Sequence, residues 1–331
     1  MTKRTVLSRC VLPAASTTEA AMRAFSLGLL VLVCFFFANI GAHADNIYVA
    51  SWGAANGYDI VKFDSSGNSS VFANWGFSYP TGFAFEGSGN LYVADNDANI
   101  IVKFDPSGHR SVFADSSSCL IYPMGLAFDK SGNLYTVNLS IDNNILKFDS
   151  SGHGSVFAYT SGNGYNLGLA FDTNGNLYVA EDGGSIEEFD PNGSRSVFAS
   201  TYLNNPHGLA FDSSGNLYVA NGGNGDAGSQ SIAKFDSSGH GSVLATSGLN
   251  IPWGLGFDSS GNLYVVNADI GTGTGSIEKF DSNGIDFGVF VSGLSNPMFI
   301  AIQVPEPATW SLLALGVIAL LGTRRFHRHS L

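Results

Sequence analysis

Residues 208–221 read GLAFDSSGNLYVAN, and this stretch decides the fold. It contains two short apolar segments, 208–211 and 217–220, separated by the polar sequence Asp-Ser-Ser-Gly-Asn. The side chain of Asp212 can cap the backbone of its own turn, and Gly215 can adopt the left-handed conformation that ends a type I turn with a bulge. The stretch therefore predicts a tight β-hairpin.

The hairpin recurs along the chain. The tyrosine of its second strand occurs at positions 48, 92, 135, 178, 218 and 264, so the spacings are 44, 43, 43, 40 and 46 residues. Each hairpin is followed by a segment ending in Lys-Phe-Asp or Glu-Phe-Asp, and then by a segment close to Ser-Val-Phe-Ala. Four short strands that recur every 40–46 residues are typical of a β-propeller blade.

The two ends of the repeated region predict how the ring closes. Residues 47–50 match the second strand of a blade that lacks a first strand, whereas residues 297–303 match a first strand with no partners after it. Five complete blades lie between them. We therefore expect an all-β, six-bladed propeller of four-stranded blades over residues 45–303, in which the last strand completes the first blade. This closure removes an open strand edge that would promote aggregation.

The composition excludes several classes of protein. Of the 331 residues, 12% are aromatic and 13% are charged, which is too apolar for a disordered chain. The net charge is −12, and nearly half of the basic residues lie in the two ends, so the repeated region is more acidic still. An acidic body without a basic stripe repels phosphate backbones, which excludes nucleic-acid binding. Cys10 and Cys34 precede the repeats, so Cys119 has no partner there for a disulfide.

The N-terminus has the features of a secretory signal peptide. Arg23 precedes an apolar run over residues 25–40, and Ala42-His43-Ala44 follows it as a small-residue cleavage site. We expect residues 1–44 to be removed by cleavage after Ala44, with Met22 as an alternative start of translation. A membrane anchor is the other interpretation, but the apolar run is shorter than the ~20 residues that a span needs.

The C-terminus combines Pro305-Glu306-Pro307, an apolar segment over residues 311–322 and a basic end with Arg324 and Arg325. Residues 304–331 resemble the PEP-CTERM sorting signal of Gram-negative, exopolysaccharide-producing bacteria. The resemblance implies transient membrane anchoring through the short apolar segment. It also implies cleavage near the proline pair by an exosortase-type membrane protease, and a final location at the cell surface or in the extracellular matrix. A plain tail anchor is the alternative.

The repeats themselves resemble NHL repeats. The shared pattern is a Pro-x-Gly strand, a Gly-Asn-x-Tyr-Val-Ala strand and a Lys-Phe-Asp strand, and it covers most of the chain. The resemblance implies a six-bladed propeller of the gluconolactonase and TolB-like superfamily. It says little about activity, because such propellers include lactonases, lyases, scaffolds and receptors.

Candidate ligand-binding residues occupy two equivalent positions in each blade. The first precedes the glycine of the innermost strand at the channel mouth, and it is occupied by Met124, Leu167, His207 and Trp253 in four blades. A lone histidine among apolar residues does not supply the three or four ligands of a zinc site. An apolar floor with one tryptophan suits a sugar or another small ligand.

The second position follows the Leu-Tyr-Val-Ala strand and is always polar. We expect Asp95, Glu181, Asn221 and Asn267 to form a polar rim around the channel mouth. The resembling gluconolactonases bind calcium with such oxygen ligands, so Asp95 and Glu181 are weak calcium candidates. Turn capping is the simpler interpretation, because Asp and Asn favour strand exits. We expect neither a catalytic residue nor a required cofactor, with calcium as an option.

The sequence leaves two functions open. The first is a noncatalytic surface or matrix protein that presents the propeller as a binding platform for polysaccharide or protein. The second is a calcium-assisted lactonase or lyase of the gluconolactonase-like type. The nearly identical blades favour the platform, because an enzyme usually breaks its symmetry around one site.

Overall fold

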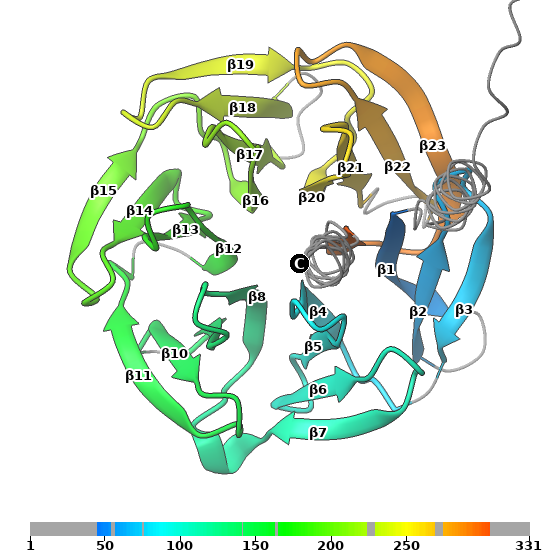
Figure 1. Ribbon diagram of the computed structural model, residues 1–331. Coiled ribbons are helices and arrows are strands. Elements are labelled where there is room, and N and C mark those ends of the chain that lie inside the picture. Colours follow the sequence, from blue (N-terminus) through cyan, green and yellow to red (C-terminus); the bar gives the residue numbers. More distant parts are fainter. Residues whose placement is uncertain are drawn as a thin grey trace, which may run out of the picture. The chain divides into compact units, whose positions relative to one another are not determined.

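A computed structural model describes residues 45–304, except 54–56, 75, 141, 163–164, 224–228 and 269–273. Six four-stranded antiparallel sheets surround a central axis, each with one strand innermost and one outermost (Figure 1). The predicted six-bladed, all-β propeller is thus confirmed. The expected signal peptide and sorting signal, with Ala42, Ala44, Pro305–Pro307, Arg324 and Arg325, lie outside the described residues.

The strands follow the chain in regular order. Blade 1 contains β1 (Asn46–Gly53), β2 (Gly57–Phe63), β3 (Ser69–Ala73) and β24 (Ile300–Gln303); blade 2 contains β4 (Pro80–Phe85), β5 (Leu91–Asp95), β6 (Ile100–Phe104) and β7 (Arg110–Ala114); blade 3 contains β8 (Pro123–Phe128), β9 (Leu134–Asn138), β10 (Asn144–Phe148) and β11 (Gly154–Tyr159). Blade 4 contains β12 (Asn166–Phe171), β13 (Leu177–Glu181), β14 (Ser185–Phe189) and β15 (Arg195–Ala199); blade 5 contains β16 (Pro206–Phe211), β17 (Leu217–Asn221), β18 (Ser231–Phe235) and β19 (Gly241–Ala245); blade 6 contains β20 (Pro252–Phe257), β21 (Leu263–Asn267), β22 (Gly275–Phe280) and β23 (Asp286–Leu294).

The ring closes through blade 1, as the sequence predicts. Strand β24 pairs with β1 in antiparallel register, with Ile47 opposite Ile302 and Val49 opposite Ile300. Beyond the ladder, the hydroxyl of Ser51 donates to the carbonyl of Ser295 at 3.3 Å and accepts from the amide of Ser295 at 3.0 Å. The first described strand and the last described strand therefore belong to one sheet.

Each hairpin turn is held by its own aspartate. In blade 5, Asp212 Oδ1 accepts hydrogen bonds from the amides of Ser214 and Asn216, both at 2.9 Å. Gly215 has φ +84°, the left-handed conformation that a glycine adopts without strain. The turn chemistry predicted from the sequence is confirmed, and it sets the register of the two strands that it joins.

The blades pack on one another through the tyrosine of the second strand. Tyr178 of blade 4 meets Phe198 of its own outer strand at 4.9 Å and Phe211 of blade 5 at 5.0 Å, both edge to face. Tyr92 and Tyr135 make the same pair of contacts in blades 2 and 3. One repeated residue therefore links each of these blades to the next, and edge-to-face geometry stabilises aromatic pairs beyond their buried area.

The innermost strands approach closely at their glycines. A Cβ atom on Gly168 would lie 2.4 Å from the carbonyl oxygen of His207, and one on Gly208 would lie 2.5 Å from that of Trp253. No larger residue fits at such a distance without moving the backbone. These strands enclose a central cavity of about 110 Å³.

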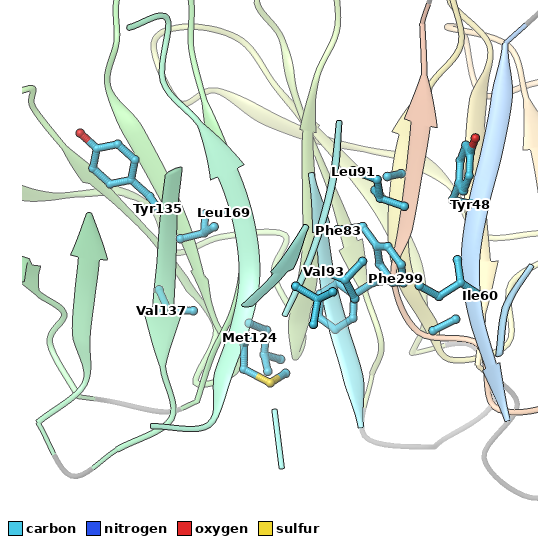
Figure 2. Packing of buried hydrophobic residues seen from close by; sticks show 14 of the residues in the cluster. Tyr48, Ile60, Phe83, Leu91, Val93, Met124, Tyr135, Val137, Leu169 and Phe299 are labelled. Atoms are coloured by element: carbon cyan, nitrogen blue, oxygen red, sulfur yellow. The ribbon is translucent and has the colours of Figure 1, made fainter. Parts of the chain in front are cut away.

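One blade departs from the glycine pattern. Phe299 occupies the equivalent position just before β24, where the other five blades have glycine. It packs in the same buried cluster as Phe83, Val93 and Ile60 (Figure 2). The closing blade thus uses an aromatic side chain where its neighbours use direct backbone contact.

Deletion of residues 297–303 tests this mode of closure. It removes the innermost strand of blade 1 together with the buried side chains of Phe299 and Ile300. We expect a loss of roughly 4 kcal/mol from these two side chains alone, and aggregation through the two strand edges left open. Denaturant unfolding and light scattering measure the two effects. A monomer of unchanged stability would contradict this mode of closure.

Candidate functional site

The channel mouth is formed by the residue that precedes the inner-strand glycine of blades 2 to 6, and by Met298 before Phe299 in blade 1. For five of these six residues, all except Thr81, the carbonyl oxygen lies against the glycine of the preceding blade, as that of His207 does against Gly168. The six backbones therefore surround one opening. In ring order from blade 2, the residues at this position are Thr81, Met124, Leu167, His207, Trp253 and Met298.

The side chains of His207 and Trp253 form an aromatic stack at this mouth. Their rings stack with centroids 3.8 Å apart and an interplanar angle of 27°. The imidazole also lies against Gly222, where an added Cβ atom would come within 2.2 Å of Cε1. His207 is thus held in one orientation and is only 2% exposed.

The hydrogen bond of His207 identifies its neutral tautomer. Nδ1 lies 3.2 Å from the carbonyl oxygen of Pro252, and a carbonyl can only accept a hydrogen bond. The neutral ring therefore carries its proton on Nδ1, and Nε2 is an acceptor. Burial lowers the pKa of His207 to about 4, against the weaker opposing effects of the Pro252 carbonyl and of Asp182, so the ring is neutral at pH 7.

Trp253 is the partly exposed member of the stack. Its Nε1–H is buried and has no hydrogen-bond partner among the described residues. The ring also meets Phe299 edge to face at a centroid distance of 6.4 Å. Trp253 therefore presents a partly exposed aromatic surface, as small-ligand contacts often do, whereas its Nε1–H lies out of reach of solvent.

The two methionines of the mouth each contact a polar side chain. Met124 is buried, and the amide of Asn96 lies 3.2 Å from its sulfur. The hydroxyl of Tyr79 lies 3.1 Å from the sulfur of Met298. Tyr79 and Asn96 are not among the residues predicted from the sequence, because the prediction considers one mouth and one rim position per blade. Their positions beside Pro80 and Asp95 are the signal that could have identified them.

The predicted rim residues lie at the ends of separate second strands. Asp95, Asn221 and Asn267 are buried, and each accepts a hydrogen bond from a backbone amide of the loop that enters its own blade. Asn221, for example, also donates to the carbonyl of Tyr202 at 2.9 Å. These bonds tie the entering loops to the sheets. The structure thus brings His207 and Trp253 together, whereas the rim residues remain in different blades. Their role in ligand binding stays a prediction.

The described residues lack two features, a cluster of three or more metal-binding side chains and a membrane-spanning helix. No group of three or more His, Cys, Asp or Glu side chains within them is arranged to hold a metal ion. None of the helices in the described part is long and apolar enough to cross a membrane.

Two family profiles match parts of the chain. Residues 303–325 match the PEP-CTERM protein-sorting motif, and residues 203–226 match the NHL repeat. Both predicted resemblances are therefore confirmed, and the NHL match spans His207 and Asn221 of the candidate site. No curated protein sequence matches this chain.

Solved structures share the fold at low sequence identity. A gluconolactonase from Xanthomonas campestris is 18% identical, with a TM-score of 0.57 over 78% of this chain and 92% of its own. A protein of unknown function from Bacteroides caccae is 15% identical, with a TM-score of 0.58 over 80% of this chain and 100% of its own. An inactive virginiamycin B lyase from Staphylococcus aureus, solved with quinupristin, is 14% identical, with a TM-score of 0.54 over 81% and 87%. At this identity they support the fold alone.

The burial of His207 predicts a specific dependence of stability on pH. The unfolded chain binds a proton near pH 6.5 and the folded chain near pH 4, so the folded state loses stability as the pH falls through this window. From pH 7 to 4.5, the wild type should lose roughly 2 kcal/mol more than His207→Gln, measured by denaturant unfolding. His240→Gln, which changes an exposed histidine at a turn, should keep the wild-type profile. Equal profiles for wild type and His207→Gln would contradict the buried neutral ring.

Proposed function

We propose that this protein is an exported, noncatalytic propeller that binds extracellular polysaccharide at its channel mouth. The observation that carries the proposal is the partly exposed indole of Trp253, which is stacked on the neutral imidazole of His207. The exposed part of the indole ring can pack on the C–H face of a sugar. Protein surfaces are the other class of ligand that such a platform accepts.

The charge of the protein favours an uncharged glycan. With a net charge of −12, the chain repels polyanions at low ionic strength. Burial keeps His207 neutral, so the stack adds no positive charge at pH 7. The mouth therefore offers dispersion and hydrogen bonding rather than ion pairing, and a neutral polysaccharide is the matching ligand.

The sorting motif supports export to the surface of a Gram-negative cell. Such a motif implies processing by an exosortase in the membrane. The finer expectation is that a signal peptidase removes residues 1–44, after which the exosortase cleaves near Pro305-Glu306-Pro307. The body would then reach the cell surface or the matrix without its basic end.

Intact-mass measurement on the protein from its native host tests this processing. The mature form should begin at Asp45 and lack Arg324 and Arg325. A mature pool that still contains these arginines would favour the plain tail anchor and contradict the processing.

Substitution of Trp253 tests the binding site. Trp253→Ala should weaken binding to a neutral polysaccharide at least about tenfold, because it removes the stacking surface. Affinity electrophoresis of the full-length chain against a panel of neutral polysaccharides measures the loss. Phe287→Ala is a matched control, because this aromatic ring is 60% exposed on the outermost strand of blade 6.

Three outcomes separate the polysaccharide-binding platform from the alternative functions. Polysaccharide binding that survives Trp253→Ala would contradict the proposed site. Capture of a surface protein that is lost in Trp253→Ala would instead make the ligand a protein. Calcium-dependent lactone hydrolysis that is lost in a double variant, Asp95→Asn with Glu181→Gln, would favour the lactonase over the platform.

A further inference from the structure

Blade 4 differs from the repeat on the face of its sheet that packs against blade 3. Its third strand β14 has Glu187 where β2, β6 and β10 have valine, valine and leucine. Glu187 pairs with Val179 across the ladder, and Val179 packs in one cluster with Val137 of blade 3. Glu181, at the end of β13, lies two residues beyond Val179 and hence on the same face. The side chains of Glu181 and Glu187 are 0% and 1% exposed, so two carboxylates are buried between these blades.

One serine connects the two carboxylates. The hydroxyl of Ser161 lies 2.8 and 3.0 Å from the two oxygens of Glu181, while its amide lies 3.3 and 3.2 Å from those of Glu187. The hydroxyl of Ser185 lies 2.7 Å from Glu181 Oε2. Carboxylate and hydroxyl oxygens from blade 4 and from the link that enters it therefore converge on one small volume.

The charge of this cluster is incompletely balanced. The pair has one described cationic partner, Arg195, whose Nη1 lies 2.6 Å from Glu187 Oε1. The Arg195 side chain is 42% exposed, so solvent weakens its compensation. The described residues thus place one cation beside two buried carboxylates, and a second positive charge would balance the pair.

An independent observation points to a ligand in the same place. Asn166 replaces the proline that the other five blades have at the start of the inner strand. Its side chain is fully buried, its Nδ2 donates to Thr160 Oγ1 at 2.9 Å, and its Oδ1 has no hydrogen-bond partner in the described part of the chain. Asn166 is the cross-strand partner of Glu181, which places both side chains on one face of the sheet. A buried unpaired carbonyl is costly, and a cation would satisfy it.

We propose that Glu181, Glu187, Asn166, Ser161 and Ser185 form a divalent-cation site between blades 3 and 4, with Ca²⁺ as the best match. Calcium takes six to eight oxygen ligands from flexible sets of carboxylates, amides and hydroxyls, and these five side chains offer seven oxygens. The site uses two carboxylates, so the absence of a three-residue acidic cluster in the described chain does not bear on it. It shares Glu181 with the predicted rim, whereas Glu187, Asn166, Ser161 and Ser185 are not rim positions.

A cation bound at this site would stabilise the link between β11 of blade 3 and β12 of blade 4. Ser161 belongs to the link that follows β11 of blade 3, whereas Asn166 opens β12 and directly precedes Leu167 of the channel mouth. The neighbouring positions of the two blades are visible in Figure 1, where β12–β15 follow β8–β11 around the ring. Bound calcium would therefore hold the entry into β12 and stabilise the folded propeller by linkage.

Thermal unfolding with added calcium tests the site. The full-length chain, stripped with a chelator, should show a saturable rise in midpoint of about 5 °C at a hundredfold excess over the dissociation constant. Glu187→Gln and Glu181→Gln should abolish the rise. Glu278→Gln is the matched control, since Glu278 occupies the equivalent position in blade 6, where asparagine replaces the second glutamate. It should retain the rise.

Two further variants distinguish a loss of calcium binding from a loss of folding. Asn166→Pro restores the residue of the other five blades, so it should fold and lose the calcium response. Arg195→Gln removes the competing positive charge and should lower the dissociation constant for CaCl₂ in a calorimetric titration. No shift of the wild-type midpoint in millimolar calcium would overturn the proposal. So would a shift that survives both Glu187→Gln and Asn166→Pro, or one that is lost only in Asp95→Asn.

Discussion

The fold depends on the close approach of neighbouring innermost strands. At Gly168 and Gly208 no Cβ atom fits between the blades, so the next carbonyl oxygen lies directly against the chain. These strands surround a central cavity of about 110 Å³. Among the residues that precede the glycines, Met124, Leu167 and His207 are buried, whereas Trp253 is partly exposed.

The sequence predicts the fold well because every blade repeats the same local signals. The Asp212 turn with Gly215 at φ +84° sets one hairpin register, and the same chemistry recurs around the ring. The pairing of β1 with β24 follows from counting strands, because each blade needs four, whereas the register of Ile47 opposite Ile302 comes from the structure. Neither inference requires knowledge of distances between blades.

The candidate site is less predictable, because its residues are departures from the repeat and their contacts cross between blades. His207 and Trp253 stand out in the sequence as deviations at one repeated position, but their 3.8 Å stack arises from the packing of blade 5 on blade 6. Glu187 is not predicted as a site residue, because it lies within an apolar strand pattern and acquires its carboxylate neighbour only through the ladder. Asn166 resembles an ordinary loop residue until its unpaired, buried oxygen is seen. In a repeat protein the departures from the repeat carry the chemistry, and their meaning depends on contacts across blades.

The closure of blade 1 also shapes how the chain folds. Asn46 and Gln303 are 257 residues apart in sequence yet share a hydrogen bond in one sheet. Blades 2 to 6 can each form from consecutive strands, whereas blade 1 must wait for a contact of very high sequence separation, and such contacts slow folding. Until then β1 has an open edge that can pair with another chain. The time between synthesis of β1 and arrival of β24 is therefore the interval in which this protein most needs protection from its own copies.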